Sequence, residues 1–329
     1  MTIGIGIGIG IVIVNYRTAL LTIECLRSLS WEHKEGSFNI IVVDNDSQDE
    51  SFETLCSAVI SEGWSDWVDI KTSGHNGGFS YGNNFAIREF MAKKYPPEFI
   101  YLLNPDTYTL DSAVSKLSAF MMRNKNVGIT GGRIEDTEGE PQYSSFQFHT
   151  FWTELNRGFG LNLLSKVLRP WVKPLRIPEV SEKTDWVSGA SMMIRRTVIE
   201  QIGLLDESYF MYFEETDFCL QATRAGWECW YVPESRVVHY VGQSSGVTNT
   251  KMTKRLPTYW FDSRRRYFLK NHGVLHALVA DLFWLSGFSS WKLRNLVQGK
   301  QDNNPPKLLQ DSFRNSVFCR GFKLTTKKE

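Results

Sequence analysis

The sequence predicts an α/β fold with a mostly parallel central sheet flanked by helices. Residues 11–14 form an apolar run, residues 20–29 repeat apolar side chains at helical spacing, and residues 39–43 form a second apolar run. A strand, a helix and a strand within about 30 residues make a βαβ unit, whose two strands are parallel. A third apolar run, 100–103, stops at Asn104-Pro105-Asp106, where proline ends the strand.

The same patterns predict the other elements in chain order. We expect a helix from 214 or 215, helices at 51–62, 85–94, 112–123 and 198–202, and strands at 68–71, 127–134 and 227–232. Residues 185–196 are predicted to form a loop followed by a buried strand. Residues 237–240 are expected to be extended. Residues 142–183 are predicted to be a long insertion loop with one short helix at 162–168, and loops of that length are usually functional or disordered.

Length and charge predict two parts. A chain of 329 residues can hold one large domain or two of ordinary size. From residue 251 to the end there are 16 Lys+Arg against 5 Asp+Glu, whereas the preceding part has 21 against 31. We therefore predict a division into 1–250 and 251–329, and the basic second part is suited to a negatively charged surface.

Five cysteines are scattered through the chain without a CxxC pair or a metal-ligand spacing. An odd, scattered count indicates reduced thiols, so we expect a cytoplasmic protein. The Ile-Gly alternation from Gly4 to Gly10 has no basic segment and no cleavage site, so it is not predicted to be a signal peptide. We assign that repeat no function.

Acidic side chains follow two of the predicted strands. Asp44 and Asp46 come after residues 39–43, and Asp106 comes after residues 100–103. The carboxyl ends of parallel strands meet at one edge of a sheet, where open α/β sheets bind ligands. One or two carboxylates together with substrate phosphates suit Mg²⁺. The alternative is that Asp106 is a turn residue before a helix from Asp111.

A Gly- and Asn-rich segment, residues 75–84, precedes the helix predicted at 85–94. A glycine loop before a helix N-terminus offers free N–H groups and a partial positive charge to a phosphate or a sugar oxygen. Most Gly-rich loops are only turns, so this segment alone is weak support for a binding site.

Glu214, Glu215 and Asp217 place three acids within four residues, directly after an aromatic run. If a helix starts there, Asp217 and Leu220 share a face that is separate from Glu215. The alternative is helix capping, because the helix dipole favours acids in the first turn. His239 lies in an extended segment, and a lone histidine is more often structural than a ligand.

In this order the motifs resemble family 2 glycosyltransferases with a GT-A fold, the branch that includes bacterial rhamnosyltransferases of cell-surface polysaccharide synthesis. The resemblance covers about three quarters of the chain. The matching pieces are Ile-Val-Ile-Val-Asn-Tyr at 11–16, Val-Val-Asp-Asn-Asp-Ser at 42–47, Asn-Gly-Gly-Phe at 76–79, Gly-Asn-Asn at 82–84, Leu-Asn-Pro-Asp at 103–106, Val-Ser-Gly-Ala at 187–190, Phe-Glu-Glu-Thr-Asp-Phe-Cys at 213–219, and His239 with Gly242 and Ser244.

The resemblance implies a role for each matching residue. Asp44 would accept the N3–H of a uracil or thymine base, in a pocket lined by Asn15. Asp106 and His239 would hold Mg²⁺ or Mn²⁺. The other positions implied to bind the nucleotide-sugar donor are Asp46, Asn76, Gly78, Asn83, Asn84 and Asn104, and those implied to bind the acceptor are Trp186, Ser188 and Gly189.

The resemblance also implies an inverting transfer. A metal at Asp106 would stabilise the charge on the departing diphosphate, and a carboxylate would take the proton of the acceptor hydroxyl. The second acid of the motif is the expected base. Here it is Glu215, where the family usually has Asp, so Glu214 and Asp217 stay open as alternatives. A double displacement would need a carboxylate nucleophile such as Asp217.

The expected reaction moves L-rhamnose from dTDP-rhamnose to a hydroxyl of a glycan or a lipid-linked glycan, with a UDP-hexose as the alternative donor. A different class is a non-catalytic protein that binds sugar nucleotides or glycans on the same fold. A nucleotidyltransferase would carry a Gly-rich, basic signature after the first strand, and residues 15–18 have no glycine.

The basic part after residue 250 interleaves aromatic residues with cations at 259–270 and is nearly all apolar at 274–285. The apolar stretch is short of the roughly 20 residues that span a bilayer. It suits a helix at the membrane interface, so we expect peripheral association with the cytoplasmic face of the inner membrane. A helix packed on the catalytic body is the alternative. Nucleic acid is not an expected partner, because the rest of the chain is acidic.

Overall fold

The computed structural model describes residues 8–33, 38–240 and 254–324. The chain forms two compact units. The first comprises Met1–Phe146, Ile177–Glu207 and Phe218–Gly246, and the second comprises Gln147–Arg176, Ser208–Asp217 and Val247–Glu329. Two segments that lie before the predicted boundary at residue 250 thus group with the C-terminal part. Most of the Ile-Gly repeat, and also Gly242 and Ser244, lie outside the described residues.

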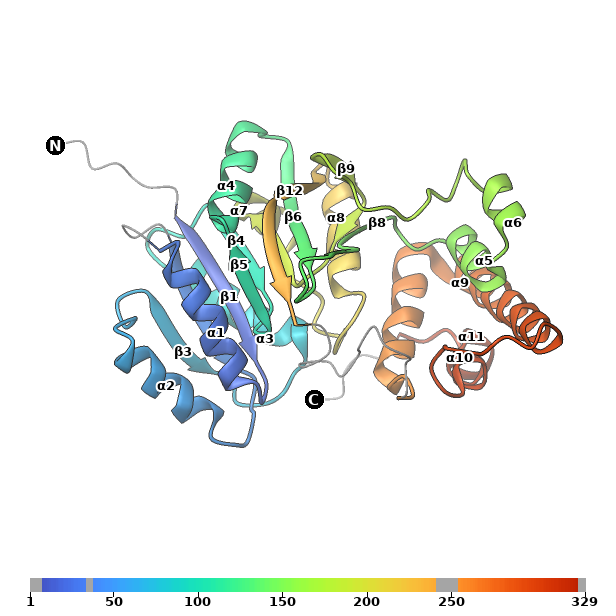
Figure 1. The fold of residues 1–329 in the computed structure, drawn as a ribbon, viewed down its shortest axis with the longest axis horizontal. Coiled ribbons are helices and arrows are strands. Elements are labelled where there is room, and N and C mark those ends of the chain that lie inside the picture. The colour runs from blue at the N-terminus through green and yellow to red at the C-terminus, as the bar shows by residue number, and fades with distance from the viewer. Residues whose placement is uncertain (1–7, 34–37, 241–253, 325–329) are drawn as a thin grey trace. The chain divides into compact units, whose positions relative to one another are not determined.

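A ten-stranded mixed sheet forms the centre of the first unit (Figure 1). Its strand order is β3-β2-β1-β4-β11-β6-β12-β5, with β7 paired to β6 and β9 paired to β12. The predicted α/β fold with a mostly parallel central sheet is confirmed, since β1 to β4 are mutually parallel. The strands are β1 (Ile9–Asn15), β2 (Phe38–Asp44), β3 (Val68–Thr72), β4 (Phe99–Leu103), β5 (Thr107–Leu110), β6 (Val127–Glu135), β7 (Pro141–Gln142), β8 (Ser145–Phe146), β9 (Glu182–Thr184), β10 (Trp186–Val187), β11 (Ser191–Arg195) and β12 (Glu228–His239).

Helices cover the sheet, as the sequence predicts. The central strands β1, β2 and β4 are buried almost throughout, with Ile11, Ile13 and Val42 fully inaccessible. Strands covered on both faces bury consecutive side chains, which explains why they appear in the sequence as unbroken apolar runs. The helices are α1 (Ala19–Ser30), α2 (Ser51–Ser61), α3 (Phe79–Met91), α4 (Ala113–Arg123), α7 (Arg196–Ile202) and α8 (Glu214–Arg224), and the boundary between the two units falls within α8.

Helix α3 begins at Phe79, so the prediction of a helix from residue 85 was wrong in its start. Gly78, at φ 88°, is the residue before the helix, and a left-handed backbone there favours glycine. Position 82, inside the helix, requires glycine because a Cβ there would come within 2.7 Å of Val14 on β1. Residues 79–84 of the Gly- and Asn-rich segment therefore form the first turns of α3, and Gly82 allows the helix to approach the sheet closely.

Two strand predictions also change. Strand β5 follows Asp106 immediately and was missed, because only four residues separate Asp106 from Asp111. Strand β12 joins the predicted strand at 227–232 to the extended segment at 237–240. Its pairing with β6 shifts register between Val232 and Arg236, around Pro233, as expected for a proline inside a strand.

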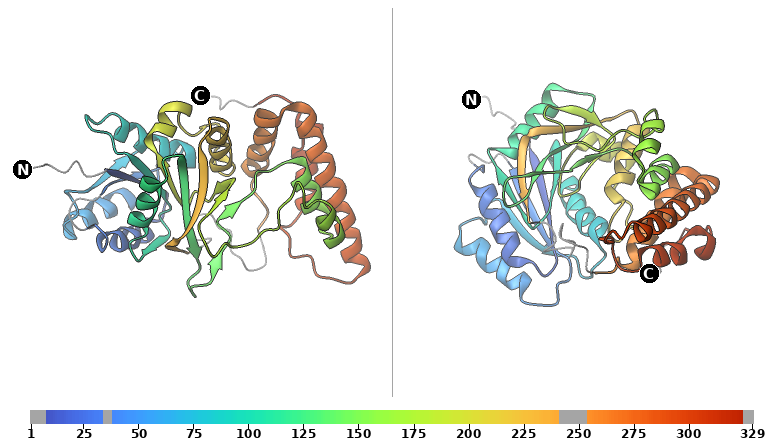
Figure 2. Two further views of the ribbon diagram at one scale, coloured as in Figure 1. Left: turned by 90° about the horizontal axis from the view of Figure 1, so that it is seen from above. Right: turned by 45° about the vertical axis from the view of Figure 1, so that its right-hand side comes forward.

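The second unit is helical. Helix α5 (Phe151–Phe159) lies alongside α9 (Thr258–Val297) (Figure 2), and a Cβ on Gly287 would come within 2.7 Å of Phe159 N. Helix α5 lies within the segment that was predicted to be a loop, and Thr150 and Thr153 form a reciprocal capping box at its start. The other helices are α6 (Asn162–Val167), α10 (Leu308–Asn315) and α11 (Val317–Arg320).

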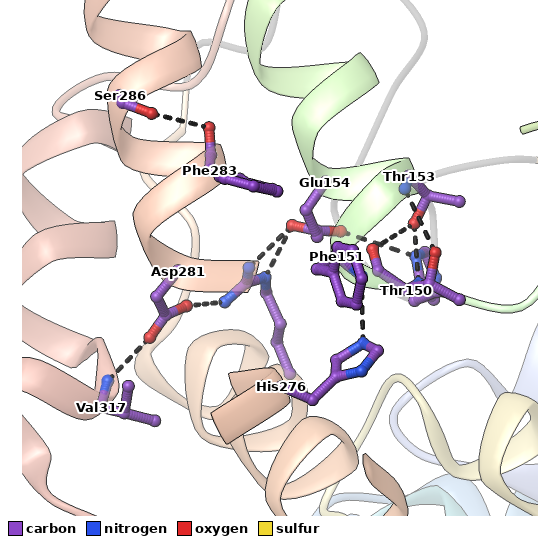
Figure 3. A network of polar contacts seen from close by, with 11 residues as sticks. Thr150, Phe151, Thr153, Glu154, His276, Asp281, Phe283, Ser286 and Val317 are labelled. Carbon is purple, nitrogen blue, oxygen red and sulfur yellow. Dashed lines mark hydrogen bonds and ion pairs between the residues drawn. The ribbon is translucent and has the colours of Figure 1, made fainter. Parts of the chain in front are cut away.

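Helix α9 breaks at Gly273, where φ is 82° and ψ is 177°. A buried ion-pair network joins its two halves: Arg264, before the break, contacts Asp281 after it and Glu154 of α5 at 2.7 Å. Asp281 also accepts the backbone N–H of Val317 at 2.8 Å, which ties α11 to the same network (Figure 3). The network therefore fixes the bend in α9 and connects three helices.

By length and composition alone, α9 is apolar and long enough to cross a membrane, and it is the one such helix within the described residues. It continues from the predicted stretch at 274–285 to Val297. A packed helix of a protein core passes the same test, and 33% of the most apolar window of α9 is buried. The length and composition of α9 are therefore compatible both with a membrane and with a protein core.

Replacing Arg264 with Met is expected to leave the buried carboxylates of Glu154 and Asp281 without their cation. Breaking a buried ion pair costs about 3–5 kcal/mol, so the free energy of unfolding in urea should fall by that amount. Arg27→Met is the matched control, because Arg27 is largely exposed and pairs with Glu24 and Glu62 on the surface. The free energy of unfolding should fall far less in Arg27→Met than in Arg264→Met. Equal losses in the two variants would contradict the proposed stabilising role of the network.

Candidate active site

The parallel register of the first unit brings polar residues to one edge of the sheet. Asn15 on β1 pairs with Asp44 on β2, and Ile13 pairs with Leu103, the last residue of β4. Asn104 and Asp106 therefore leave the sheet at the same edge as Asn15 and Asp44. This arrangement is the one predicted from the strand ends.

Asp44 is buried and held by hydrogen bonds. Asn15 Nδ2 donates to its Oδ1 at 2.7 Å, Ser47 Oγ donates to Oδ1 at 2.5 Å, and Ser47 N donates to Oδ2 at 3.1 Å. Thr22 Oγ1 in turn donates to Asn15 Oδ1 at 3.0 Å, which orients the amide. A carboxylate oxygen has two lone pairs, so Oδ2 has room for one further donor. No role was assigned to Ser47 from the sequence, although Asp followed three residues later by Ser is a turn-forming pattern.

Asn45 connects the end of β2 to the loop before α3. Its Nδ2 donates to Asn76 Oδ1 and to Gly78 O, both at 3.1 Å, and its Oδ1 accepts from Ser73 Oγ at 2.9 Å. Asn45 was not predicted from the sequence to be a site residue. Asp46, beside it, is half-buried and has a left-handed backbone with φ 61°.

The two asparagines of α3 make different contacts. Asn83 Nδ2 donates to Phe79 O within the helix. Asn84 is buried and binds the segment 205–207, donating to Leu205 O at 2.8 Å and to Glu207 Oε1 at 2.9 Å and accepting from Leu205 N. The amide of Asn84 is thus occupied in holding that segment to α3.

Asp106 lies against His239 because β12 pairs with β5. His239 is opposite Thr107, and Tyr240 N donates to Asp106 O at 2.9 Å. His239 Nε2 is 3.2 Å from Asp106 Oδ1 and 3.3 Å from Asn104 Nδ2. Asp106 is inaccessible, whereas 17% of the His239 side chain is exposed. A carboxylate, an imidazole and an amide therefore meet at the end of β4.

These residues fit a divalent cation whose coordination is completed by a substrate. Among the described residues, no group of three or more His, Cys, Asp or Glu could hold a metal ion. Mg²⁺ commonly binds one or two carboxylates together with phosphate oxygens and keeps waters. Asp106 and His239 would supply the protein part of such a shell.

Two of the residues predicted to bind the acceptor lie in a loop beside the same edge. Asn104 N donates to Ala190 O at 3.1 Å, so the loop holding Ser188 and Gly189 adjoins the end of β4. Trp186 stacks on Phe146 with ring centroids 4.4 Å apart. An additional cavity of about 500 Å³, lined by Ile9, Phe99 and Arg195 among others, is at the opposite ends of these strands and includes none of the predicted site residues.

The acidic motif of the second unit forms the first turn of α8. Tyr212 and Phe213, just before it, have φ of 70° and 69°, a left-handed backbone that costs energy in aromatic residues. Phe213 is buried against Tyr267 and Trp260. This packing supports the strained entry into the helix.

The three acids of this turn have different surroundings. Glu214 and Asp217 are buried, whereas Glu215 is partly buried as a residue and its Oε2 is inaccessible. Burial, and next the Glu215 carboxylate, raise the pKa of Glu214 well above its usual range. Glu214 Oε2 has no hydrogen-bond partner among the described residues. Burial and the neighbouring carboxylate thus favour the protonated form of Glu214 in the folded chain.

The raised pKa of Glu214 predicts a pH-dependent effect of Glu214→Gln. Below the ordinary Glu pKa of about 4.3 the residue is neutral in both folded and unfolded chains, so the wild type carries no penalty. As the pH rises above that value, folding opposes ionisation and the wild type loses stability relative to the amide variant. Urea unfolding across this range should show the gap in unfolding free energy widening with pH, and a constant gap would contradict the prediction.

Comparison with known proteins agrees with this fold. The chain belongs to the glycosyltransferase like family 2, which matches residues 7–258, and it is a glycosyltransferase. It is 30% identical over 260 residues to the low-salt glycan biosynthesis hexosyltransferase Agl10 of Haloferax volcanii, covering 79% of this chain and 74% of that protein. It is 26% identical over 223 residues to the N-acetylglucosaminyl-diphospho-decaprenol L-rhamnosyltransferase of Mycobacterium tuberculosis, covering 64% and 69%.

A solved structure supports the fold assignment. The mannosyltransferase PcManGT from Pyrobaculum calidifontis, in complex with GDP-Man and Mn²⁺, superposes with a TM-score of 0.55 at 13% identity, over 88% of this chain and 74% of that one. The predicted GT-A fold is thereby confirmed. At that identity the likeness concerns the fold alone.

Proposed function

We propose that this glycosyltransferase moves L-rhamnose from dTDP-rhamnose to a hydroxyl of a glycan or lipid-linked glycan, with inversion and with a divalent metal. The observation that carries the proposal is the edge where Asn15, Asp44, Asn104 and Asp106 gather, with His239 at 3.2 Å from Asp106. Similarity to the N-acetylglucosaminyl-diphospho-decaprenol L-rhamnosyltransferase of Mycobacterium tuberculosis supports the choice of sugar and of a lipid-linked acceptor.

The donor would bind with its base at Asp44. The free lone pair of Oδ2 suits the N3–H of thymine or uracil, and the bonds from Asn15 and Ser47 hold the carboxylate in place. Asp46, Asn76, Gly78 and Asn83 would also contact the donor. Asn45 would hold the loop that carries Asn76 and Gly78.

Asp106 and His239 would hold Mg²⁺ or Mn²⁺ beside the diphosphate. The bound metal would supply Lewis-acid stabilisation of the charge on the departing phosphate. Asn104, within hydrogen-bond distance of His239, would orient the imidazole.

Glu215 would be the general base. Burial raises the pKa of Glu214, and Asp217 is buried and accepts a hydrogen bond from Asn271, so we take Glu215, the least buried acid of this turn, as the base. It would take the proton of the acceptor hydroxyl while the oxygen bonds to the anomeric carbon. The bond from that carbon to the β-phosphate oxygen breaks in the same step, and the nucleoside diphosphate leaves with the electron pair.

Glu215→Gln is expected to lower kcat by about 10²–10⁴-fold, because the amide cannot accept the proton, while donor KM changes less than about twofold. The assay measures dTDP released from dTDP-rhamnose in the presence of a soluble glycan acceptor and Mg²⁺. Wild type with EDTA is the metal control. Undiminished turnover by Glu215→Gln would contradict the base assignment.

A second candidate donor is a UDP-hexose, which the hexosyltransferase relative supports. The same assay with UDP-glucose and UDP-galactose separates the two. A chain that binds donors but releases no nucleoside diphosphate from any of them would be the non-catalytic binding protein.

We also propose that the second unit docks on a membrane surface. After Gly273, helix α9 exposes Leu275, Leu282, Leu293 and Leu296 by 76%, 55%, 63% and 78%. Their spacings are close to whole 3.6-residue turns, so the four leucines form one outward stripe. Such a stripe, within the basic part of the chain, suits a helix lying at an anionic interface.

The double variant Leu282→Glu with Leu293→Glu should lose most of its binding to phosphatidylglycerol vesicles, by about tenfold or more, since two apolar contacts become charged. Ile60→Glu is the matched control, because Ile60 is 74% exposed in the first unit. The measurement is co-flotation with vesicles. Equal flotation of both variants, or none by the wild type, would contradict membrane docking through α9.

A further inference from the structure

Asp217 is held by two neighbouring residues of α9. Lys270 Nζ lies 2.7 Å from Asp217 Oδ2, and Asn271 Nδ2 donates to Asp217 Oδ1 at 2.6 Å. Tyr209 Oη approaches the same Oδ1 at 3.4 Å. We call these contacts of Lys270 and Asn271 with Asp217 the clasp. All of its members belong to the second unit.

The clasp is buried. Asp217 is 2% exposed and Asn271 is 9% exposed, and 29% of the Lys270 side chain is accessible. A buried carboxylate is costly unless it is both paired and hydrogen-bonded, and the clasp supplies a cation to one oxygen and an amide donor to the other. Tyr209 is fully buried, and Lys270 lies 5.7 Å from the centre of its ring, which supports the ammonium from another side. The position of Asp217 is therefore strongly specified.

Helix geometry transmits this constraint to Glu215. At 3.6 residues per turn, residues two apart point in nearly opposite directions, so Asp217 and Glu215 occupy opposite sides of α8. Asp217 N also donates to Phe213 O at 2.8 Å, which closes the first turn on the strained residue before it. Anchoring Asp217 fixes the rotation of this turn, and with it the direction in which Glu215 projects.

We propose that Lys270 and Asn271 are positioning residues that act through Asp217 to orient Glu215. This inference rests on the proposed function, since it takes Glu215 as the base. It assigns Asp217 to anchoring rather than to proton transfer or nucleophilic attack. It also makes the first half of α9 part of the catalytic apparatus, beyond any contact of that helix with a membrane.

Lys270→Met is expected to lower kcat by at least about tenfold while donor KM changes less than about twofold, because misplacing a base slows the chemical step without weakening donor binding. Asn271→Leu should act in the same direction. Lys270→Arg should restore kcat to within about threefold of wild type, since it keeps the charge at Asp217. Lys292→Met, on the second half of α9 and 44% exposed, is the matched control and should match wild type.

A double-mutant cycle tests whether the clasp is the route. Lys270→Met combined with Asp217→Asn should be no slower than the slower of the two single variants, because both break the same contact. If the double variant lost kcat by the product of the two single losses, Lys270 would act elsewhere than through Asp217, and the proposal would be overturned. Circular dichroism identifies variants that fail to fold. If Lys270→Met does not fold, the proposal is tested by the other two variants: Asn271→Leu should lower kcat, and Lys270→Arg should keep it within about threefold of wild type.

Two outcomes separate this inference from the function on which it rests. If wild type releases no nucleoside diphosphate from any donor tested, the proposed function fails, and the positioning role fails with it. If wild type is active but Lys270→Met and Asn271→Leu keep its kcat, or change only KM, the positioning role fails while the glycosyltransferase stands.

Discussion

The register between neighbouring strands is the constraint on which the first unit depends. It pairs Asn15 with Asp44, and it sets His239 opposite Thr107, so that the imidazole reaches Asp106. A slip of one residue would turn every side chain of a strand to the other face and remove both contacts. Burial of β1, β2 and β4 on both faces opposes such a slip, because polar neighbours would then enter the core. The hydrophobic core thus positions the polar edge.

In the second unit the corresponding constraint is the pairing of buried charges. Arg264 neutralises Glu154 and Asp281, Lys270 neutralises Asp217, and Arg255 contacts the buried Asp311. Part of the positive charge of the C-terminal region is therefore internal, and it is not all available to an anionic surface. Removing one partner of any of these pairs would leave a buried charge unpaired, and that charge would destabilise the fold. The basic residues of this region therefore stabilise the fold by pairing with buried acids, in addition to their proposed role at a membrane.

The sequence predicts the strands of the first unit well because their burial leaves a continuous apolar signal, and proline marks the end of β4. It misses β5, α5 and the start of α3, where short elements or glycines follow tertiary packing rather than local preference. Within the site, Asp44 and Asp106 can be found from their place after a strand. The contact between Lys270 and Asp217 joins residues that are 53 positions apart in the chain, so no periodicity in the sequence predicts it. Glu215 differs from Glu214 and Asp217 in being less buried as a residue, and burial depends on the fold.

The most direct test of the donor site is a crystal structure of the protein with dTDP and Mn²⁺, in which anomalous scattering locates the metal. We expect a manganese peak within coordination distance of the Asp106 carboxylate and His239 Nε2, between these residues and the β-phosphate. We also expect the thymine N3 to be hydrogen-bonded to Asp44. A metal bound away from Asp106 and His239, or a base bound away from the edge where β1 and β2 end, would contradict the proposed donor site.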